Sequence, residues 1–274
     1  MIIPTYNEAG NIATIISRIL ASAPVDVLVV DDASPDGTGH IVDLIAATET
    51  RVTALHRSGK QGLGAAYLSG LAHGKASGYS LLIEMDADGS HPPAALLSMI
   101  SALAEDTTGR IGGVVGSRWT RGGSVVDWPK SREFISRGGS FYARIMLGIK
   151  VRDVTAGFRV YRTDALDLLK LASVESQGYC FQIDMTRRML RAGFELVEIP
   201  IEFREREIGE SKMSRAILIE AMLMTTKCGF LRAFGHSGIR ARCQDTPDGR
   251  HGTVLLMRTA LDGFLWRKAH LSKR

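Results

Sequence analysis

Asp86 and Asp88 are the residues whose types and spacing best suit metal chemistry, because they directly follow the apolar segment 81–85. A glycine and two prolines just beyond them predict a turn, which lets both carboxylates point the same way. Close carboxylates repel each other unless a cation joins them, and hard oxygen ligands of this kind suit Mg²⁺ or Mn²⁺. Ser90 and His91 can add a ligand or a supporting contact. The alternative is a solvated acidic pair that caps the helix expected next.

A second acidic pair, Asp31 and Asp32, follows the apolar segment 25–30 in the same way. One of these carboxylates can accept hydrogen bonds from a nucleobase N–H or a ribose hydroxyl. The other can form the turn that residues 34–37 predict and cap the helix after it. The two interpretations are compatible, because each needs only one aspartate.

The glycine-rich segment 59–64 can hold an anion on the backbone N–H groups of a helix start, with Lys60 facing a phosphate. It is not a P-loop, because Gln61 stands where Ser or Thr is required. It is not a dinucleotide-binding fingerprint either, because Tyr67 stands at the third glycine position. The alternative is a tight turn between a strand and a helix.

The charged segment 204–214 is a further candidate for anion binding, since it contains Arg206 and the run Gly-Glu-Ser-Lys that ends at Lys212. A polar loop of this composition is flexible enough to fold over a bound anion. The alternative is a solvated charged loop.

The elements that must position these residues alternate between strand-like and helix-like patterns. We expect strands at residues 1–4, 25–30, 52–55, 81–85 and 111–116, and helices at 8–23, 39–48, 64–76 and 93–104. This alternation predicts an α/β fold with a mostly parallel, Rossmann-like sheet and helices on both faces. Ligands of such sheets bind at the carboxyl ends of the strands, where the acidic and basic residues described above lie.

Beyond residue 118 the pattern is less regular, and the chain ends in a basic tail. We expect helices at 132–147, 182–192 and 216–234, strands at 157–161 and 196–203, a linker at 235–252 and a last amphipathic helix at 253–271. We therefore predict a main domain at residues 1–226 and a basic, partly flexible appendage at residues 227–274.

Composition excludes several classes of protein. The chain has 274 residues, of which 45% are hydrophobic and 23% charged, so it can bury a sizeable core and is not wholly disordered. The longest apolar stretch, 216–224, is interrupted by Glu220, so we expect neither a membrane-spanning helix nor a secretory signal. Cys180, Cys228 and Cys243 form no CxxC pair, which argues against disulfides and zinc and suits a reducing cytosol.

The net charge of +5 is unevenly distributed. Residues 227–274 carry ten Lys+Arg against three Asp+Glu, and residues 118–162 show the same excess. Such asymmetry indicates an anionic partner, either a phosphorylated substrate, a membrane surface or nucleic acid, although a solvated basic face is equally compatible. Nucleic acid is disfavoured, because the basic residues are not interleaved with stacking aromatic residues.

With these residues assembled, the sequence resembles family-2 glycosyltransferases, and more narrowly the dolichol-phosphate or polyprenol-phosphate mannose synthases. Eight motifs carry the resemblance, in order, through residues 4–212. They are Pro4-Thr5-Tyr6-Asn7-Glu8, Val30-Asp31-Asp32-x-Ser34-Pro35-Asp36-Gly37-Thr38, Gly59-Lys60-x-Gly62-Leu63-Gly64, Asp86-Ala87-Asp88-x-Ser90-His91-Pro92, Gly116-Ser117-Arg118, Ile135-Ser136-Arg137-Gly138, Asp153-x-Thr155-x-Gly157-Phe158-Arg159 and Arg206-x-x-Gly209-Glu210-Ser211-Lys212. The first, second and fourth are shared with the wider superfamily, and the later motifs indicate the polyprenol-phosphate branch.

The resemblance implies a GT-A fold for residues 1–226 and a nucleotide-diphosphate sugar donor, usually GDP-mannose. It implies a role for each matching residue. The nucleoside pocket would be lined by Pro4, Tyr6, Glu8, Val30 and Asp32. The metal would be bound by Asp86 and Asp88, with Ala87 alongside and Ser90 as a further candidate ligand. The acceptor phosphate would contact Arg118 and Arg137, and the donor diphosphate would be covered by Arg206 and Lys212. Asp86, Asp88 and Arg118 would thus be the catalytic residues.

The implied reaction transfers mannose to a polyprenyl monophosphate with inversion. The acceptor phosphate is largely dianionic near neutral pH, so no general base is needed. Because the lipid is in a membrane, we expect peripheral attachment on the cytoplasmic face through residues 216–234 and the basic tail, with or without a membrane-anchoring partner protein. The alternatives are a polyprenyl-phosphate glucosyltransferase that uses UDP-glucose, another family-2 enzyme, or a non-enzymatic phosphate- or nucleic-acid-binding module.

Overall fold

The computed structural model describes residues 1–171, 174, 179–206, 222–223, 225–226 and 229–230. The chain divides into two units, Met1–Ala233 and Phe234–Arg274, and every described residue belongs to the first. Lys212, the expected linker and the expected last helix lie outside the described residues. The domain boundary at residue 226 therefore stays a prediction. The expected helix 216–234 is described at six positions, all of them helical.

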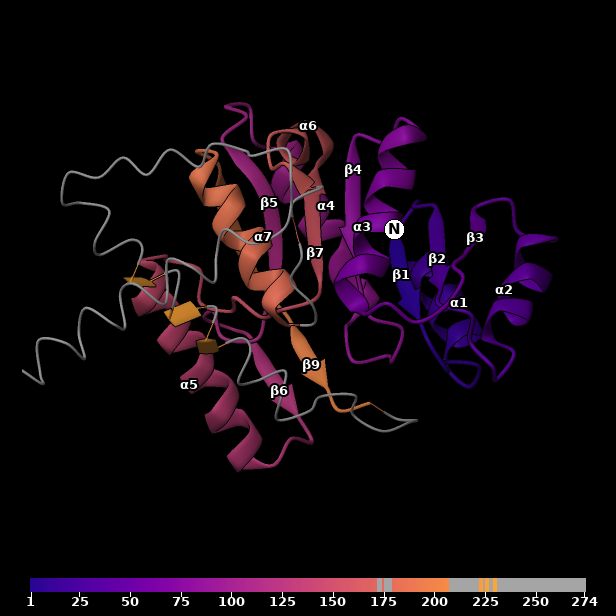
Figure 1. Ribbon diagram of the computed structural model, residues 1–274, viewed down its shortest axis with the longest axis horizontal. Coiled ribbons are helices and arrows are strands. Elements are labelled where there is room, and N and C mark those ends of the chain that lie inside the picture. The colour runs from indigo at the N-terminus through magenta and orange to yellow at the C-terminus, as the bar shows by residue number, and fades with distance from the viewer. Residues whose placement is uncertain (172–173, 175–178, 207–221, 224, 227–228, 231–274) are drawn as a thin grey trace, which may run out of the picture. The chain divides into compact units, whose positions relative to one another are not determined.

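The core of the described unit is a seven-stranded sheet in the order β3-β2-β1-β4-β7-β5-β8 (Figure 1). Its strands are β1 (Ile2–Thr5), β2 (Val27–Asp31), β3 (Val52–His56), β4 (Leu81–Glu84), β5 (Ile111–Ser117), β7 (Arg159–Arg162) and β8 (Glu195–Pro200). Of these seven strands only β7 is antiparallel to its neighbours, β4 and β5. The mostly parallel sheet that the sequence predicts is confirmed.

Helices cover both faces of this sheet, as expected. They are α1 (Ile12–Ser22), α2 (Thr38–Ala46), α3 (Leu63–Ala76), α4 (Leu96–Ala104), α6 (Thr163–Asp167) and α7 (Tyr179–Arg191). A further helix, α5 (Lys130–Leu147), packs instead in a separate cluster with Val151, Val154 and Ile183 of α7. Neighbouring residues of β1 point to opposite faces: Ile3 packs in one cluster with α1, α2 and α4, and Ile2 packs in another with α3, α6 and α7. Both clusters are fully apolar at their centres, so burial on the two faces holds the sheet between the helices.

The spacing of isoleucines explains how α1 forms. Ile12, Ile15, Ile16 and Ile19 recur at intervals of three and four residues, and all four are buried. This spacing places them on one helix face, which packs on the sheet. These isoleucines belong to the same apolar cluster as Ile3 of β1 and Val29 of β2. This packing fixes the position of the loop that joins β1 to α1.

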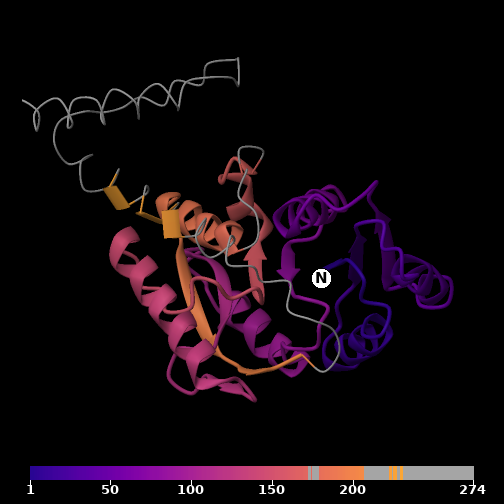
Figure 2. The same cartoon turned by 60° about the horizontal axis from the view of Figure 1, so that its bottom comes forward.

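The expected strand 196–203 is in fact two strands. β8 ends at Pro200, and β9 (Glu202–Arg204) pairs instead with β6 (Ser124–Val126) in a second, two-stranded parallel sheet. Buried Ile201 lies between them: its N–H donates to the Ser117 carbonyl, and its own carbonyl accepts from Ser124 N–H. This local bonding redirects the chain, which sequence periodicity does not reveal. Figures 1 and 2 show β6 and β9 beside α5.

The first half of the chain, through α3, and the second half, from α5 to α7, lie on opposite sides of the described unit (Figure 2). β1 and β4 come together at the middle of the sheet, next to the antiparallel β7. The loops that leave β1, β2 and β4 therefore meet loops from the second half of the chain.

Candidate active site

The turn after β4 carries Asp86 and Asp88 at the centre of the sheet edge. Asp88 is buried, Asp86 is half-buried, and Ala87 between them is buried in the core. Gly89 adopts a φ of 75°, a left-handed conformation that suits glycine and reverses the chain here. The turn predicted from this glycine is therefore present.

The Asp86 carboxyl is held between a tyrosine and a glycine. Tyr67, fully buried on α3, donates a hydrogen bond from its hydroxyl to Oδ1 of Asp86 at 2.9 Å. On the other side, a Cβ added to Gly157 would lie 3.1 Å from Oδ2 of Asp86, so a side chain at this position would crowd the carboxylate. Burial raises the pKa of Asp86, the Asp88 charge raises it further, and the Arg206 charge opposes the shift.

Asp88 is bound by two groups. Its Oδ1 accepts the backbone N–H of Ser90 at 3.1 Å, and its Oδ2 lies 2.8 Å from the Arg206 guanidinium. Arg206 comes from the segment just after β9, so this ion pair joins two distant parts of the chain at the turn. Ser90 is itself buried, and its carbonyl accepts the backbone N–H of Arg204. The arginine that the resemblance assigns to the donor diphosphate thus lies directly beside the aspartates.

His91 is a buried neighbour of the same turn. Its ring contacts Phe158 and Phe203, with ring centroids 5.6 Å and 5.0 Å away. Burial lowers its pKa, so the imidazole is neutral near pH 7. Nδ1 of His91 has no hydrogen-bond partner in the described part of the chain. Its aromatic surroundings favour a packing role in the wall of the site.

The two aspartates at the end of β2, Asp31 and Asp32, make different contacts, as the sequence analysis allows. Asp31 forms the turn: it accepts hydrogen bonds from the Thr5 hydroxyl at 2.9 Å and from the N–H and hydroxyl of Ser34 at 3.0 and 2.6 Å. Asp32 instead pairs with Arg57 at 2.6 Å and accepts the backbone N–H of Gln61 at 3.3 Å. Asp32 therefore connects β2 to the glycine-rich loop before α3.

The remaining residues predicted for the nucleoside side cluster around the β1 and β2 ends. Pro4 and Val30 are paired in register and buried. Nζ of Lys60 lies 4.3 Å above the centroid of the Tyr6 ring, which brings the glycine-rich loop over the end of β1. The backbone N–H of Glu8 donates to the Thr38 hydroxyl, and this bond holds the loop against α2.

A second group of cations lies after β5. Arg118 is 5% exposed, and its Nε and one NH₂ each donate to Asp153 at 2.7 Å in a bidentate pair. The same NH₂ donates to the Thr155 hydroxyl at 3.1 Å. The guanidinium also lies over the Trp119 and Trp128 rings, 5.2 and 5.6 Å from their centroids. Asp153 thus already occupies the fork of this guanidinium and holds it in a fixed orientation.

Two arginines of α5 extend this group. Arg137 lies over the Trp119 ring at 4.2 Å and pairs with Glu133 at 2.7 Å. Arg132, which the sequence analysis did not single out, lies 4.1 Å over the Trp128 ring and pairs with Glu205. It is related to Arg118 through the Trp128 ring, which both guanidinium groups contact.

A buried polar network under the aspartates was also missed. Glu84 on β4 accepts a hydrogen bond from the side-chain amide of Gln182 on α7 at 2.9 Å, and burial raises its pKa to about 7. The fully buried Arg159 donates to the Thr186 hydroxyl and to the Val154 carbonyl, each at 2.8 Å. The network ties α7 to the strands that carry the site.

The donor set at the turn fits a divalent cation with open coordination positions. No group of three or more His, Cys, Asp or Glu side chains in the described ranges gathers in a geometry that could hold a metal. Desolvation and the neighbouring Asp88 charge both raise the pKa of Asp86, and a cation between the two carboxylates would nevertheless stabilise their charged forms. Hard oxygen pairs of this kind suit Mg²⁺ or Mn²⁺, which keep waters or substrate phosphates as further ligands.

Comparison with known proteins shows which family this chain resembles. Residues 1–169 match the family model described as glycosyl transferase family 2. An undecaprenyl-phosphate mannosyltransferase of Micrococcus luteus is 49% identical over 242 residues, which cover 88% of this chain and 97% of that protein. A polyprenol monophosphomannose synthase of Mycolicibacterium smegmatis is 47% identical over 231 residues, covering 84% of this chain and 86% of that protein.

Solved structures share the fold at low sequence identity. A crystal structure of glucosyl-3-phosphoglycerate synthase from Mycobacterium tuberculosis, in complex with Mn²⁺, UDP-glucose and glycerol 3-phosphate, has a TM-score of 0.59 and 18% identity. The match covers 85% of this chain and 79% of that one. A complex of the same enzyme with Mg²⁺ and UDP gives a TM-score of 0.58. These likenesses confirm the predicted α/β fold class of GT-A type.

Proposed function

Because the chain belongs to glycosyl transferase family 2 and is a glycosyltransferase, we propose that it transfers mannose from GDP-mannose to a polyprenyl monophosphate with inversion. The names of the two curated relatives support the sugar and the lipid phosphate acceptor. The observation that carries the proposal is the position of the acidic turn between two groups of cations. Arg206 pairs with Asp88 on one side, and on the other side Arg118 and His91 of the turn both contact the Phe203 ring.

In this proposal Asp86 and Asp88 hold Mg²⁺ or Mn²⁺, with Ser90 as a third candidate ligand. The bound cation supplies positive charge that stabilises the departing diphosphate. Tyr67 keeps Oδ1 of Asp86 in place, which leaves the other oxygen to face the cation. Arg206 moves from Asp88 to the diphosphate when the donor binds, and Lys212 joins it there.

The donor's nucleoside lies over the ends of β1 and β2. This part of the proposed pocket is lined by Pro4, Tyr6, Glu8, Val30 and Asp32, with Ala87 alongside. Asp32 is held in place by Arg57 and by Gln61 N–H, so its carboxylate is preorganised to accept a hydrogen bond from the base or ribose. Lys60, above the Tyr6 ring, is near enough to meet a phosphate.

The acceptor phosphate binds on the arginine side, at Arg118 and Arg137, and Arg132 adds a third cation. The second pKa of a phosphate monoester is about 6, so the acceptor is largely dianionic at neutral pH. One of its oxygens attacks C1 of mannose, the bond from C1 to the diphosphate oxygen breaks, and the electron pair leaves with GDP. No proton moves in this step. Attack opposite the leaving group converts an α-linked donor into a β-linked product.

The enzyme works at a membrane surface in this proposal, peripherally on the cytoplasmic face. In the residues that the structure describes, no helix has the length and apolar character to span a bilayer. α5 instead exposes Phe134, Ile135, Phe141 and Ile145, which are 80%, 54%, 60% and 59% accessible. An exposed apolar face on a helix with several basic residues is typical of interfacial helices. Met222, Leu223 and Phe230, within the predicted attachment segment, are exposed as well.

A donor panel tests the proposal. Purified protein would be mixed with polyprenyl phosphate, Mg²⁺ and radiolabelled GDP-mannose, UDP-glucose or GDP-glucose in separate reactions. We expect lipid-extractable label from GDP-mannose, and its release by mild acid as mannose. If only UDP-glucose gives labelled lipid, the enzyme is the alternative glucosyltransferase. If no donor gives labelled lipid, polyprenyl phosphate is not the acceptor.

A further inference from the structure

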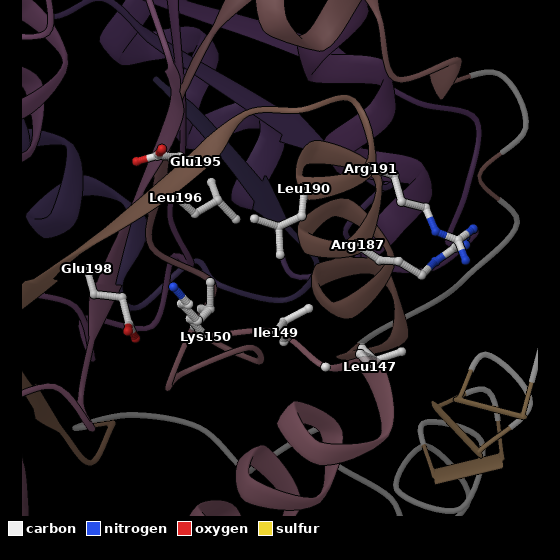
Figure 3. Close-up of a pocket in the computed structure, with 11 residues that line it drawn as sticks. Leu147, Ile149, Lys150, Arg187, Leu190, Arg191, Glu195, Leu196 and Glu198 are labelled. Atoms are coloured by element: carbon white, nitrogen blue, oxygen red, sulfur yellow. The ribbon is translucent and has the colours of Figure 1, made fainter. Parts of the chain in front are cut away.

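A pocket of about 660 Å³ lies at the β8 edge of the large sheet, and none of the proposed active-site residues lines it. It is formed by the end of α5 and the following residues, the outer face of α7, and β8 (Figure 3). The apolar centre of the pocket is formed by Leu147, Ile149, Leu190 and Leu196. The cations that line it are Lys150, Arg187 and Arg191. A pocket with an apolar floor and a cationic rim suits a ligand that has both an anionic group and an apolar part.

The charge of this pocket is positive once existing pairs are counted. Its two carboxylates are already engaged: Glu195 pairs with Arg110 at 2.6 Å, and Glu198 accepts two backbone N–H groups. Neither Lys150 nor Arg191 has an ion-pair partner within the described portion of the chain, and both are exposed.

The two arginines are placed to act together. Arg187 and Arg191 are four residues apart on α7, and Figure 3 shows their side chains side by side, extending away from Leu190 at the rim of the pocket. Arg187 shares its partner, Asp184, with Arg188, so this group of side chains keeps an excess positive charge.

The pocket borders the C-terminal end of α5. Leu147, the last residue of α5, lines the pocket from the buried face of the helix, whereas Phe141 and Ile145 are exposed on another face. Both the pocket and an exposed apolar surface therefore involve the second half of α5.

We propose that this pocket binds an anionic membrane lipid, with the lipid phosphate at Arg187 and Arg191 and the first acyl carbons over Leu190, Ile149 and Leu196. Cations at a headgroup phosphate and aliphatic side chains along the chain are the complementary chemistry. This lipid is distinct from the acceptor of the proposed reaction, whose phosphate is assigned to Arg118 and Arg137.

A short path of hydrogen bonds joins the pocket to the proposed acceptor site. Glu198 in the pocket wall accepts the backbone N–H groups of Arg152 and Asp153, each at 2.9 Å. Asp153 is the bidentate partner of Arg118. A lipid that orders this wall therefore orders the arginine that meets the acceptor, and we expect anionic lipid to raise the transfer rate.

Calorimetry with the full chain tests the binding. The probes are dihexanoyl phosphatidylglycerol below its micellar concentration, dihexanoyl phosphatidylcholine and inorganic phosphate. We expect binding of the phosphatidylglycerol only, weakened about tenfold or more by Arg191→Glu because the substitution reverses one charge. Leu190→Trp, which fills the apolar centre, should also abolish binding. Arg18→Glu, an equal charge change at an exposed position on α1, should leave it unaltered.

Three results would overturn the proposal: no binding of phosphatidylglycerol by the wild-type protein, equal binding by the Arg191→Glu and Arg18→Glu variants, or inorganic phosphate binding as tightly as the lipid. Circular dichroism melting of each variant identifies any that fails to fold, and Lys150→Glu then replaces it. Transfer assays on phosphatidylglycerol and phosphatidylcholine vesicles test the coupling separately. Absence of transfer on both vesicles would count against the proposed function, whereas the calorimetry alone decides whether the pocket binds lipid.

Discussion

The hydroxyl of Tyr67 donates a 2.9 Å hydrogen bond to Oδ1 of Asp86, from the face of α3 that is buried against the sheet. Tyr67 stacks on Phe181 of α7, with ring centroids 5.8 Å apart, so its position is fixed by packing as well. The helix thereby determines which carboxylate oxygen of Asp86 faces the proposed cation. Tyr67 is in this sense a positioning residue.

Tyr67→Phe should weaken Mn²⁺ binding by about 10- to 100-fold, because a hydrogen bond to a charged group is lost while the packing is kept. Electron paramagnetic resonance titration of Mn²⁺ in the presence of GDP measures the affinity directly. Tyr79→Phe is the matched control, since Tyr79 donates a similar bond to Asp26 at an exposed position. Equal Mn²⁺ affinity in the two variants would show that the Tyr67 hydroxyl has no role in the site.

Glu84 should make the protein less stable as the pH rises from about 4.5 to about 7. Burial raises its pKa to about 7, so the folded state favours the protonated carboxyl. The stabilising effect of this protonation is complete below the unfolded pKa and is lost as the pH rises through the folded one. Glu84→Gln should remove this contribution, which is roughly 3 kcal/mol for a shift of this size.

Urea unfolding of the wild-type protein and the Glu84→Gln variant at pH 5 and pH 8 tests this prediction. Comparing the two proteins at each pH cancels the titration of all other groups. The variant should gain stability relative to the wild type on going to pH 8. A constant difference between the two proteins would mean that the Glu84 carboxyl titrates normally.

Much of this arrangement follows from the sequence, because parallel strands must end at one edge. The apolar runs before Asp31 and Asp86 fix which residues leave that edge, and Gly89 indicates the turn. The pairing of Asp31 with Ser34 also follows from turn chemistry.

Contacts between distant residues could not be predicted in the same way. Tyr67 is recognisable in the sequence only as a break in a glycine pattern, and its bond to Asp86 depends on how closely α3 packs on β1 and β4. The contact of Glu84 with Gln182, almost a hundred residues further along the chain, likewise depends on tertiary packing. The division of the expected strand 196–203 follows from the pairing of β9 with β6, which no local periodicity encodes.

Arg137→Ala should raise the KM for polyprenyl phosphate by about tenfold and leave the affinity for GDP-mannose unchanged, since the charge removed lies on the proposed acceptor side. Steady-state kinetics with the two substrates varied in turn separates the effects. Arg18→Ala on α1 removes an exposed arginine far along the chain from this group and should change neither constant. A rise in the KM for GDP-mannose alone would show that Arg137 contacts the donor and not the acceptor.

Ile145→Ser should reduce binding to anionic vesicles severalfold, because one exposed apolar side chain of the α5 face is removed from the membrane contact. Flotation with liposomes at low and high salt measures the bound fraction. Leu97→Ser is the matched control, since Leu97 is 53% exposed on α4 and Ile145 is 59% exposed. If both substitutions reduce flotation equally, α5 is not the membrane-facing element.

Asp88→Ala provides the most direct test of the central proposal, that Asp86 and Asp88 hold the cation on which sugar transfer depends. Transfer of labelled mannose to polyprenyl phosphate and Mg²⁺-dependent binding of GDP-mannose would be measured on the same preparation. The account predicts loss of transfer and donor binding that no longer responds to Mg²⁺, in a variant that still folds. A folded variant that transfers mannose at the wild-type rate would contradict it.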